Sequence, residues 1–114
     1  MEAQEYSLVW NEFPSYTIQT FKDLLLDKNF TDVTLVSDSG QQLNTHKVIL
    51  ATCSTFFRRV LLNNPHPNPL IYLQGISHQN LETILKFMYL GQAQLSQADL
   101  YEFLAACKVL KSKE

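Results

Sequence analysis

The stretch FTDVTLVSDSGQQLNTHKVILATCS, residues 30–54, predicts the centre of the fold. Residues 31–37 are rich in β-branched side chains and end at Asp38-Ser39-Gly40, which is typical of a strand that enters a tight turn. Residues 41–46 then return as a second strand. The first half of the stretch therefore predicts a β-hairpin.

The second half of the stretch predicts two short helices that meet at Ser54. Residues 47–53, KVILATC, form a continuous apolar run, and Ser54 is a suitable N-cap for the helix that follows it. That helix ends before residues 63–69, which hold three prolines in five residues and cannot be helical. We expect a surface loop there.

Periodicity predicts the other elements. Residues 6–10 alternate as a strand does, and residues 14–27 show the three- and four-residue spacing of an amphipathic helix. Residues 70–73 predict a third sheet strand, and residues 93–95 a further short one. Two longer helices are expected, one from a cap at Ser77 to Gly91 and one that starts at Ser96 with Asp99 in a capping-box pattern. The predicted fold class is α+β and rich in helix.

Length and composition predict one domain over residues 1–114. The 114 residues are 46% hydrophobic and 18% charged, which suits a single core that folds without disulfide bonds or a structural metal ion. A net charge of −2 disfavours direct contact with nucleic acid or an acidic membrane. The acidic start MEAQEYS and the absence of 18 consecutive apolar residues predict a chain that is neither exported nor membrane-spanning. Cys53 and Cys107 are expected as buried thiols in a reducing, intracellular compartment.

The predicted strand at residues 6–10 has no hairpin neighbour. Its backbone groups need a distant partner, either in the same subunit or in another one. A leading strand that carries Tyr6, Leu8 and Trp10 would also expose an apolar patch if it hung free. Exchange of identical elements between subunits is a low-cost route to a dimer, so we expect an obligate dimer at least.

Four separated motifs resemble those of the BTB/POZ domain family. They are Phe30-Thr31-Asp32-Val33-Thr34-Leu35, His46-Lys47-Val48-Ile49-Leu50-Ala51, Ser54 with Phe56-Phe57, and Phe87-Met88-Tyr89-Leu90-Gly91, and the match spans about residues 6–110. The leading YSLVWNEF is similar to the N-terminal signature of the tramtrack group of arthropod transcription factors, through Leu8, Trp10 and Asn11. The chain departs from that signature at Val9, where Arg is usual, and at Glu12, where Asn is common.

The resemblance implies a small mixed sheet surrounded by five to six helices, with the N-terminal strand exchanged between subunits. It further implies a homodimer that associates into larger assemblies, reportedly hexamers, in the nucleus. The chain would be the self-associating part of a transcription regulator whose DNA-binding unit lies elsewhere, and residues 111–114 would begin a linker. Other tramtrack-group BTB domains and corepressors are further expected partners.

Interface residues are expected in the leading strand and along one face of the helix at residues 14–27. An isologous interface brings the same surface of both subunits together, although a purely intrachain core role is the alternative for the helix residues. The expected set is Tyr6, Leu8, Val9, Trp10, Phe13, Ile18, Phe21, Leu24 and Leu25.

Asp32 and Lys47 correspond to a charged pocket near the dimer interface of the family. We expect their carboxylate and ammonium groups to pair, and removal of one partner from a buried pair costs about 3 to 5 kcal/mol. In the alternative interpretation Lys47 extends to solvent and Asp32 only ends a loop.

Two other classes of function have less support in the sequence. A substrate adaptor for a cullin-type ubiquitin ligase would use the same fold, but such adaptors commonly carry a hydrophobic-x-Glu pattern after the third helix, and residues 63–69 contain no Glu. An enzyme is not expected, since the sequence has no Gly-rich phosphate loop, metal-ligand cluster or nucleophile elbow. No cofactor or metal is therefore predicted. His46 is expected to be satisfied by local backbone groups, and His66 and His78 to lie in surface loops.

Overall fold

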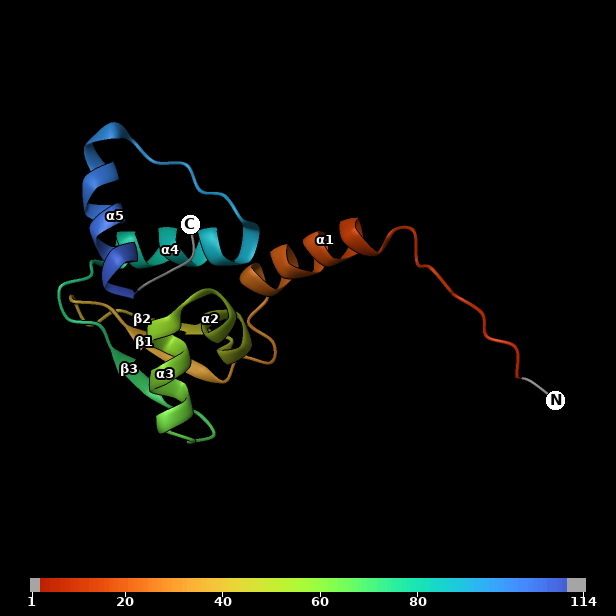
Figure 1. Cartoon of the computed structure of the whole chain (residues 1–114). Coiled ribbons are helices and arrows are strands. Elements are labelled where there is room, and N and C mark those ends of the chain that lie inside the picture. Colours follow the sequence, from red (N-terminus) through yellow and green to blue (C-terminus); the bar gives the residue numbers. More distant parts are fainter. Residues whose placement is uncertain (1–2, 111–114) are drawn as a thin grey trace.

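A computed structural model describes residues 3–110 as five helices and one three-stranded sheet (Figure 1). The sheet has the order β2-β1-β3, with β1 antiparallel to β2 and parallel to β3. This small mixed sheet surrounded by helices confirms the expected fold class. The elements in chain order are α1 Phe13–Leu26, β1 Val33–Val36, β2 Gln42–Thr45, α2 Lys47–Cys53, α3 Thr55–Asn63, β3 Leu70–Tyr72, α4 His78–Leu90 and α5 Gln97–Leu110.

The predicted hairpin is formed by β1 and β2. Its register places Leu35 opposite Leu43, and the Gly40 N–H closes the turn by donating to the Ser37 carbonyl oxygen at 2.9 Å. Gly40 adopts a φ of +87°, a conformation that glycine reaches without steric cost. The turn chemistry read from the sequence is therefore confirmed.

Three predicted helix boundaries are also confirmed. The hydroxyl of Ser54 accepts a hydrogen bond from the Phe57 N–H and caps α3, and the hydroxyl of Ser77 accepts from the Asn80 N–H and caps α4. Gly91 ends α4 with a φ of +76°. Side-chain caps and a left-handed C-terminal residue satisfy helix-end groups that have no partner within the helix.

The core lies where the sheet meets helices α2 to α5. Its largest fully buried side chains come from every one of these layers, which joins them into one unit. In Figure 1, α1 and the preceding chain project away from this body. The core side chains with 0% exposure are Leu35, Leu50, Phe57, Leu81 and Leu110.

Two predicted strands are absent from the described residues. Neither residues 6–10 nor residues 93–95 have strand structure, so both predictions are wrong for a single chain. A strand exists only through hydrogen bonds to a neighbour, and neither segment has a neighbouring strand within residues 3–110. The linker predicted at residues 111–114 lies outside the described residues. No helix among the described residues is long and apolar enough to cross a membrane.

Candidate protein-interaction surface

Residues 3–12, here called the N-terminal arm, run as an extended segment away from the body of the protein (Figure 1). All of them are exposed. Leu8 and Val9 are 94% and 76% exposed, although both are aliphatic. The arm therefore presents apolar side chains and backbone hydrogen-bonding groups to solvent together.

Three aromatic rings form a cluster where the arm meets α1. The ring of Trp10 lies 5.2 Å from that of Phe13 and 4.8 Å from that of Tyr16, measured between centroids. The Phe13 N–H donates to the Trp10 carbonyl oxygen at 3.1 Å, which ties the end of the arm to the first turn of the helix. Each ring stays more than half exposed, so the cluster packs against itself and not into the core.

Helix α1 has no buried residue, although its apolar stripe was predicted to pack on a partner surface. The stripe divides into two parts. Leu24 and Leu25 pack against the core, at the end of the helix that contacts α4. Ile18 remains 67% exposed and Phe21 36%. The chain itself thus uses the C-terminal end of the stripe and leaves its N-terminal end uncovered.

The arm and the N-terminal half of α1 together make one continuous stretch of uncovered apolar side chains. Burial of one such side chain is worth about 1.5 to 3 kcal/mol. Contiguous apolar patches of this kind are rare on soluble monomers and mark protein-interaction sites. The members of this stretch are Tyr6, Leu8, Val9, Trp10, Phe13, Tyr16 and Ile18.

Asp32 and Lys47 lie in contact, but the predicted pairing of their charged groups is wrong. The Asp32 carboxylate accepts a hydrogen bond from the backbone N–H of Lys47 at 2.7 Å. The Lys47 ammonium donates to the carbonyl oxygen of His66 at 2.5 Å instead. Lys47 is the first residue of α2, so its amide has no partner inside the helix, and the negative carboxylate suits the positive end of the helix dipole. Asp32, which lies 15 positions before Lys47 in the chain, therefore caps the N-terminus of α2.

A buried polar network around Tyr89 was not found by sequence reasoning. The Tyr89 hydroxyl accepts from the His46 backbone N–H at 3.1 Å and lies 2.6 Å from His46 Nδ1 and 2.5 Å from Thr45 Oγ1. His46 Nε2 lies 2.8 Å from the Asn29 carbonyl oxygen, so Nε2 carries a proton, and with that single proton on the ring Nδ1 accepts from Tyr89. Burial raises the pKa of the Tyr89 hydroxyl, against hydrogen bonds from Thr45 and His46 that lower it.

The ring nitrogens of His46 thus meet a backbone carbonyl 17 positions away and a side chain 43 positions away, so the expected satisfaction by local backbone groups is wrong. The network also fixes the segment between α1 and β1. Phe30, next to Asn29, has a φ of +63°, a costly conformation for a residue other than glycine, and its side chain is 88% exposed. Only the surrounding contacts hold such a backbone in place.

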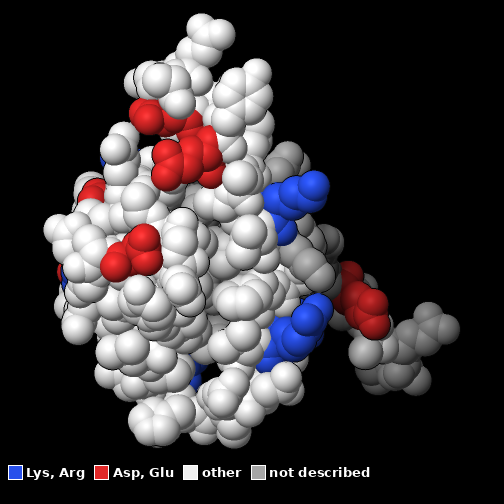
Figure 2. All heavy atoms as spheres, turned by 90° about the vertical axis from the view of Figure 1, so that its left-hand side faces the viewer, with Lys and Arg blue, Asp and Glu red and all other residues white. Residues whose placement is uncertain are grey.

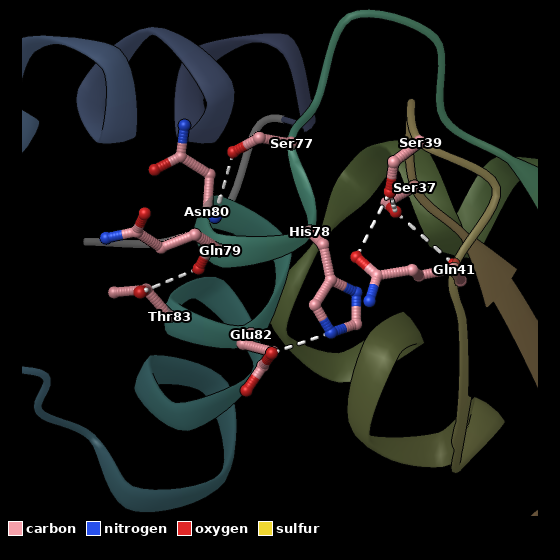
Figure 3. Close-up of polar contacts among 9 residues, drawn as sticks. All are labelled: Ser37, Ser39, Gln41, Ser77, His78, Gln79, Asn80, Glu82 and Thr83. Carbon is pink, nitrogen blue, oxygen red and sulfur yellow. Dashed lines mark hydrogen bonds and ion pairs between the residues drawn. The ribbon is translucent and has the colours of Figure 1, made fainter.

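His78 is not a loop residue as predicted. It is the first residue of α4, and its Nε2 lies 2.6 Å from a carboxylate oxygen of Glu82 one turn along the helix (Figure 3). His66 does lie in the loop before β3. Among residues 3–110, no group of three or more His, Cys, Asp or Glu side chains could hold a metal ion.

Comparisons with known proteins identify the family of this chain. A family model described as BTB/POZ domain matches residues 21–114. The chain is 40% identical to "Longitudinals lacking protein-like" of Drosophila melanogaster, over 96% of this chain and 86% of that protein. It is 37% identical to Drosophila protein abrupt and 34% identical to the tramtrack alpha isoform, over 95% and 99% of this chain but only 12% and 14% of those proteins.

Solved structures show the same fold. The BTB domain of human gigaxonin has a TM-score of 0.78 at 25% identity, and the match covers 96% of this chain and 90% of that one. The BTB domain of zebrafish PATZ1 has a TM-score of 0.80 at 22% identity, over 95% of this chain and 88% of that one. The resemblance inferred from the four motifs and from the leading signature is confirmed.

Proposed function

The chain belongs to the BTB/POZ domain family, a family of protein-interaction modules, and we propose that it acts by binding further copies of itself within a transcription regulator. The observation that carries the proposal is the uncovered apolar stretch of the arm and α1. A chain that exposes Leu8, Val9 and Ile18 beside a well-packed core gains from covering them. A second copy offers the same surface, as a two-fold interface requires.

The two predicted strands that a single chain lacks support an exchange of arms. Residues 6–10 and residues 93–95 both alternate as strands do, and both lack a neighbouring strand within residues 3–110. We infer that the arm of each chain pairs with residues 92–96 of the other. Beside that segment lies a hollow of 460 Å³ lined by Leu90, Gln92, Ala93 and Gln94, which offers room for the side chains of an added strand. Each subunit then supplies the neighbouring strand that residues 92–96 of its partner lack.

The biological product of this association is an assembly of DNA-binding chains in the nucleus. The relatives abrupt and tramtrack are several times longer than this chain, which leaves room in such proteins for a separate DNA-binding unit. Linked binding units engage DNA with an avidity about 10² to 10⁴ times higher without any new base contact. Other tramtrack-group BTB domains and corepressors are the further partners that this role implies.

Light scattering coupled to size exclusion tests the proposal with two matched variants. Ile18→Lys places a charge on the uncovered face of α1, where the side chain is 67% exposed. Val109→Lys changes a residue of α5 that is 64% exposed, where a cation suits the end of the helix. We expect dimers or larger species for the wild type and Val109→Lys, and monomers for Ile18→Lys and for a chain without residues 1–12. A folded wild-type monomer at micromolar concentration contradicts the proposal.

A role as cullin adaptor is the alternative that this fold also serves. Residues 63–69 lack the Glu expected of such adaptors, so we expect no capture of a cullin N-terminal fragment by the immobilised domain. Capture that survives Ile18→Lys would favour the adaptor role over self-association.

A further inference from the structure

Strand β3 is an open edge of the sheet. It is the last strand in the order β2-β1-β3, and among residues 3–110 it pairs with β1 only. The Thr34 N–H donates to the Pro69 carbonyl oxygen at 3.0 Å, and the Leu73 N–H donates to the Val36 carbonyl oxygen at 2.9 Å. Because the backbone groups of successive strand residues alternate in direction, Pro69 and Leu73 face β1, and Leu70 and Tyr72 direct their N–H and C=O groups outward.

This edge is short and follows prolines, but it carries no charged residue that would repel an added strand. None of Leu70, Ile71 and Tyr72 is charged, and the side chains of Leu70 and Tyr72 are 59% and 53% exposed. A groove of 630 Å³ lies beside the strand and is lined by Val60 and Leu61 of α3, by β3 itself and by the segment 64–69, which adds the polar Asn64, His66 and Asn68. Most of the surface is neither acidic nor basic on the side of the molecule seen in Figure 2. An added strand would meet hydrogen-bonding groups and apolar side chains together.

We propose that β3 pairs in antiparallel register with β3 of another copy, around a two-fold axis at Ile71. This inference rests on the proposed self-association and adds a second contact to it. In this register Leu70 lies opposite the partner's Tyr72, and each such pair exchanges two hydrogen bonds. Both pairs together satisfy all the outward N–H and C=O groups of the two residues on each chain. Two sheets become one six-stranded sheet.

A second copy is favoured as the occupant because the edge is complementary to itself. The outward groups are symmetric about Ile71, so the same three residues serve as both halves of the contact. Prolines at positions 65, 67 and 69 prevent the strand from growing at its N-terminal end, and β3 itself has three residues, so the contact is short. A longer extended ligand would leave its own backbone groups unpaired beyond them.

Two different isologous contacts on each chain join the copies in even numbers, and the assembly closes where the two two-fold axes intersect. Dimers joined by arm exchange would associate through their two β3 edges into rings of two or three dimers. A three-residue strand contact buries much less than the roughly 1,200 Å² of a stable interface, so it is weaker than the exchanged dimer. On dilution, we expect the assembly to release dimers before it releases monomers.

Charge substitutions at the edge test both the contact and its register. In Leu70→Lys/Tyr72→Lys, each Lys faces another Lys across the axis, and we expect dimers only. In Leu70→Lys/Tyr72→Glu, each Lys faces a Glu, and we expect tetramers or hexamers at low salt that dissociate into dimers near 1 M salt, where the screening length is only about 3 Å. Sedimentation velocity over a hundredfold range of concentration distinguishes these species, and thermal melting confirms that both variants are folded.

Hydrogen exchange in the wild type provides a measurement that needs no variant. The amides of Leu70 and Tyr72 should be protected at concentrations at which the large species dominates and should exchange freely in the dimer. The edge contact is overturned by a wild type that stays dimeric at every concentration, by free exchange of both amides in the large species, or by identical behaviour of the two double variants. A monomeric wild type overturns the proposed function as well, whereas a dimer that never grows leaves that function intact.

Discussion

Replacement of Tyr89 by Phe removes one hydroxyl from the buried network and tests how much that network stabilises the fold. The hydroxyl accepts from the His46 N–H, donates to His46 Nδ1 and bonds Thr45 Oγ1. The three residues are 6% exposed or less, so water cannot replace the lost partner. The two His46 groups lose their partner at about 1 to 3 kcal/mol each, while the Thr45 hydroxyl can rotate. We expect a loss of about 3 kcal/mol.

Urea denaturation followed by far-ultraviolet circular dichroism measures this loss. All variants must be compared at one protein concentration, because association couples to unfolding. Tyr101→Phe is the matched control, since Tyr101 is 80% exposed and should change the free energy of unfolding by less than about 0.5 kcal/mol. If Tyr89→Phe is as stable as this control, the hydrogen-bond network does not carry the stability assigned to it.

Three further predictions follow from the contacts described. Asp32→Ala should lower the free energy of unfolding by about 2 kcal/mol and Lys47→Met by about 1 kcal/mol, because the carboxylate caps α2 through a backbone N–H. If urea denaturation shows the larger loss for Lys47→Met, an ion pair between the two side chains is the better interpretation. The Tyr89 pKa lies above its ordinary value of 10.0, so its protonated form stabilises the fold fully below pH 10 and this stability is lost as the pH rises through the raised pKa. Urea melts from pH 8 to 11 should show the gap between wild type and Tyr89→Phe narrowing, and a constant gap would disprove the assignment. Ser54→Ala should cost about 2 kcal/mol in the same assay, because this hydroxyl caps α3 and also donates to the Leu110 carbonyl oxygen at 2.5 Å; a cost below 0.5 kcal/mol would count against it.

Local chemistry made the hairpin and the helix ends predictable from sequence. Asp38-Ser39-Gly40 can close a turn, Ser54 and Ser77 can cap helices, and Gly91 can end one, whatever the rest of the chain does. Each of these features depends on atoms within a few residues of one another. The structure confirms them, and the distant hydrogen bond that the Ser54 hydroxyl donates to the Leu110 carbonyl oxygen leaves its cap on the Phe57 N–H intact.

The partners in the pocket of Asp32 and Lys47 were predicted in part. Sequence placed the two residues together through the family resemblance, but side-chain charge suggested the wrong donor. A rigid backbone N–H at a helix start loses no conformational freedom when it binds a carboxylate, whereas a Lys side chain does. The flexible ammonium instead reaches the His66 carbonyl oxygen. Pairing by charge sign alone cannot distinguish these two donors.

The network of Tyr89 could not be derived from pattern at all. His46 and Tyr89 are 43 positions apart in the chain, and they meet only because α4 packs beside the end of the hairpin. An alternating or helical pattern identifies which face of an element is buried. It does not identify which polar groups on two buried faces will meet. Such contacts emerge only when the elements are placed in three dimensions.

The two strands that the sequence predicted and one chain lacks have a common physical cause. Alternation of apolar side chains describes a segment that can bury one face, but a strand also needs a row of backbone groups opposite its own. Residues 6–10 and 93–95 meet the first condition and not the second within residues 3–110. If residues 6–10 of one chain pair with residues 93–95 of another, the predicted strands are absent from a single chain and present in a dimer. The absence of one contact between two chains would then explain why both segments lack strand structure in a single chain.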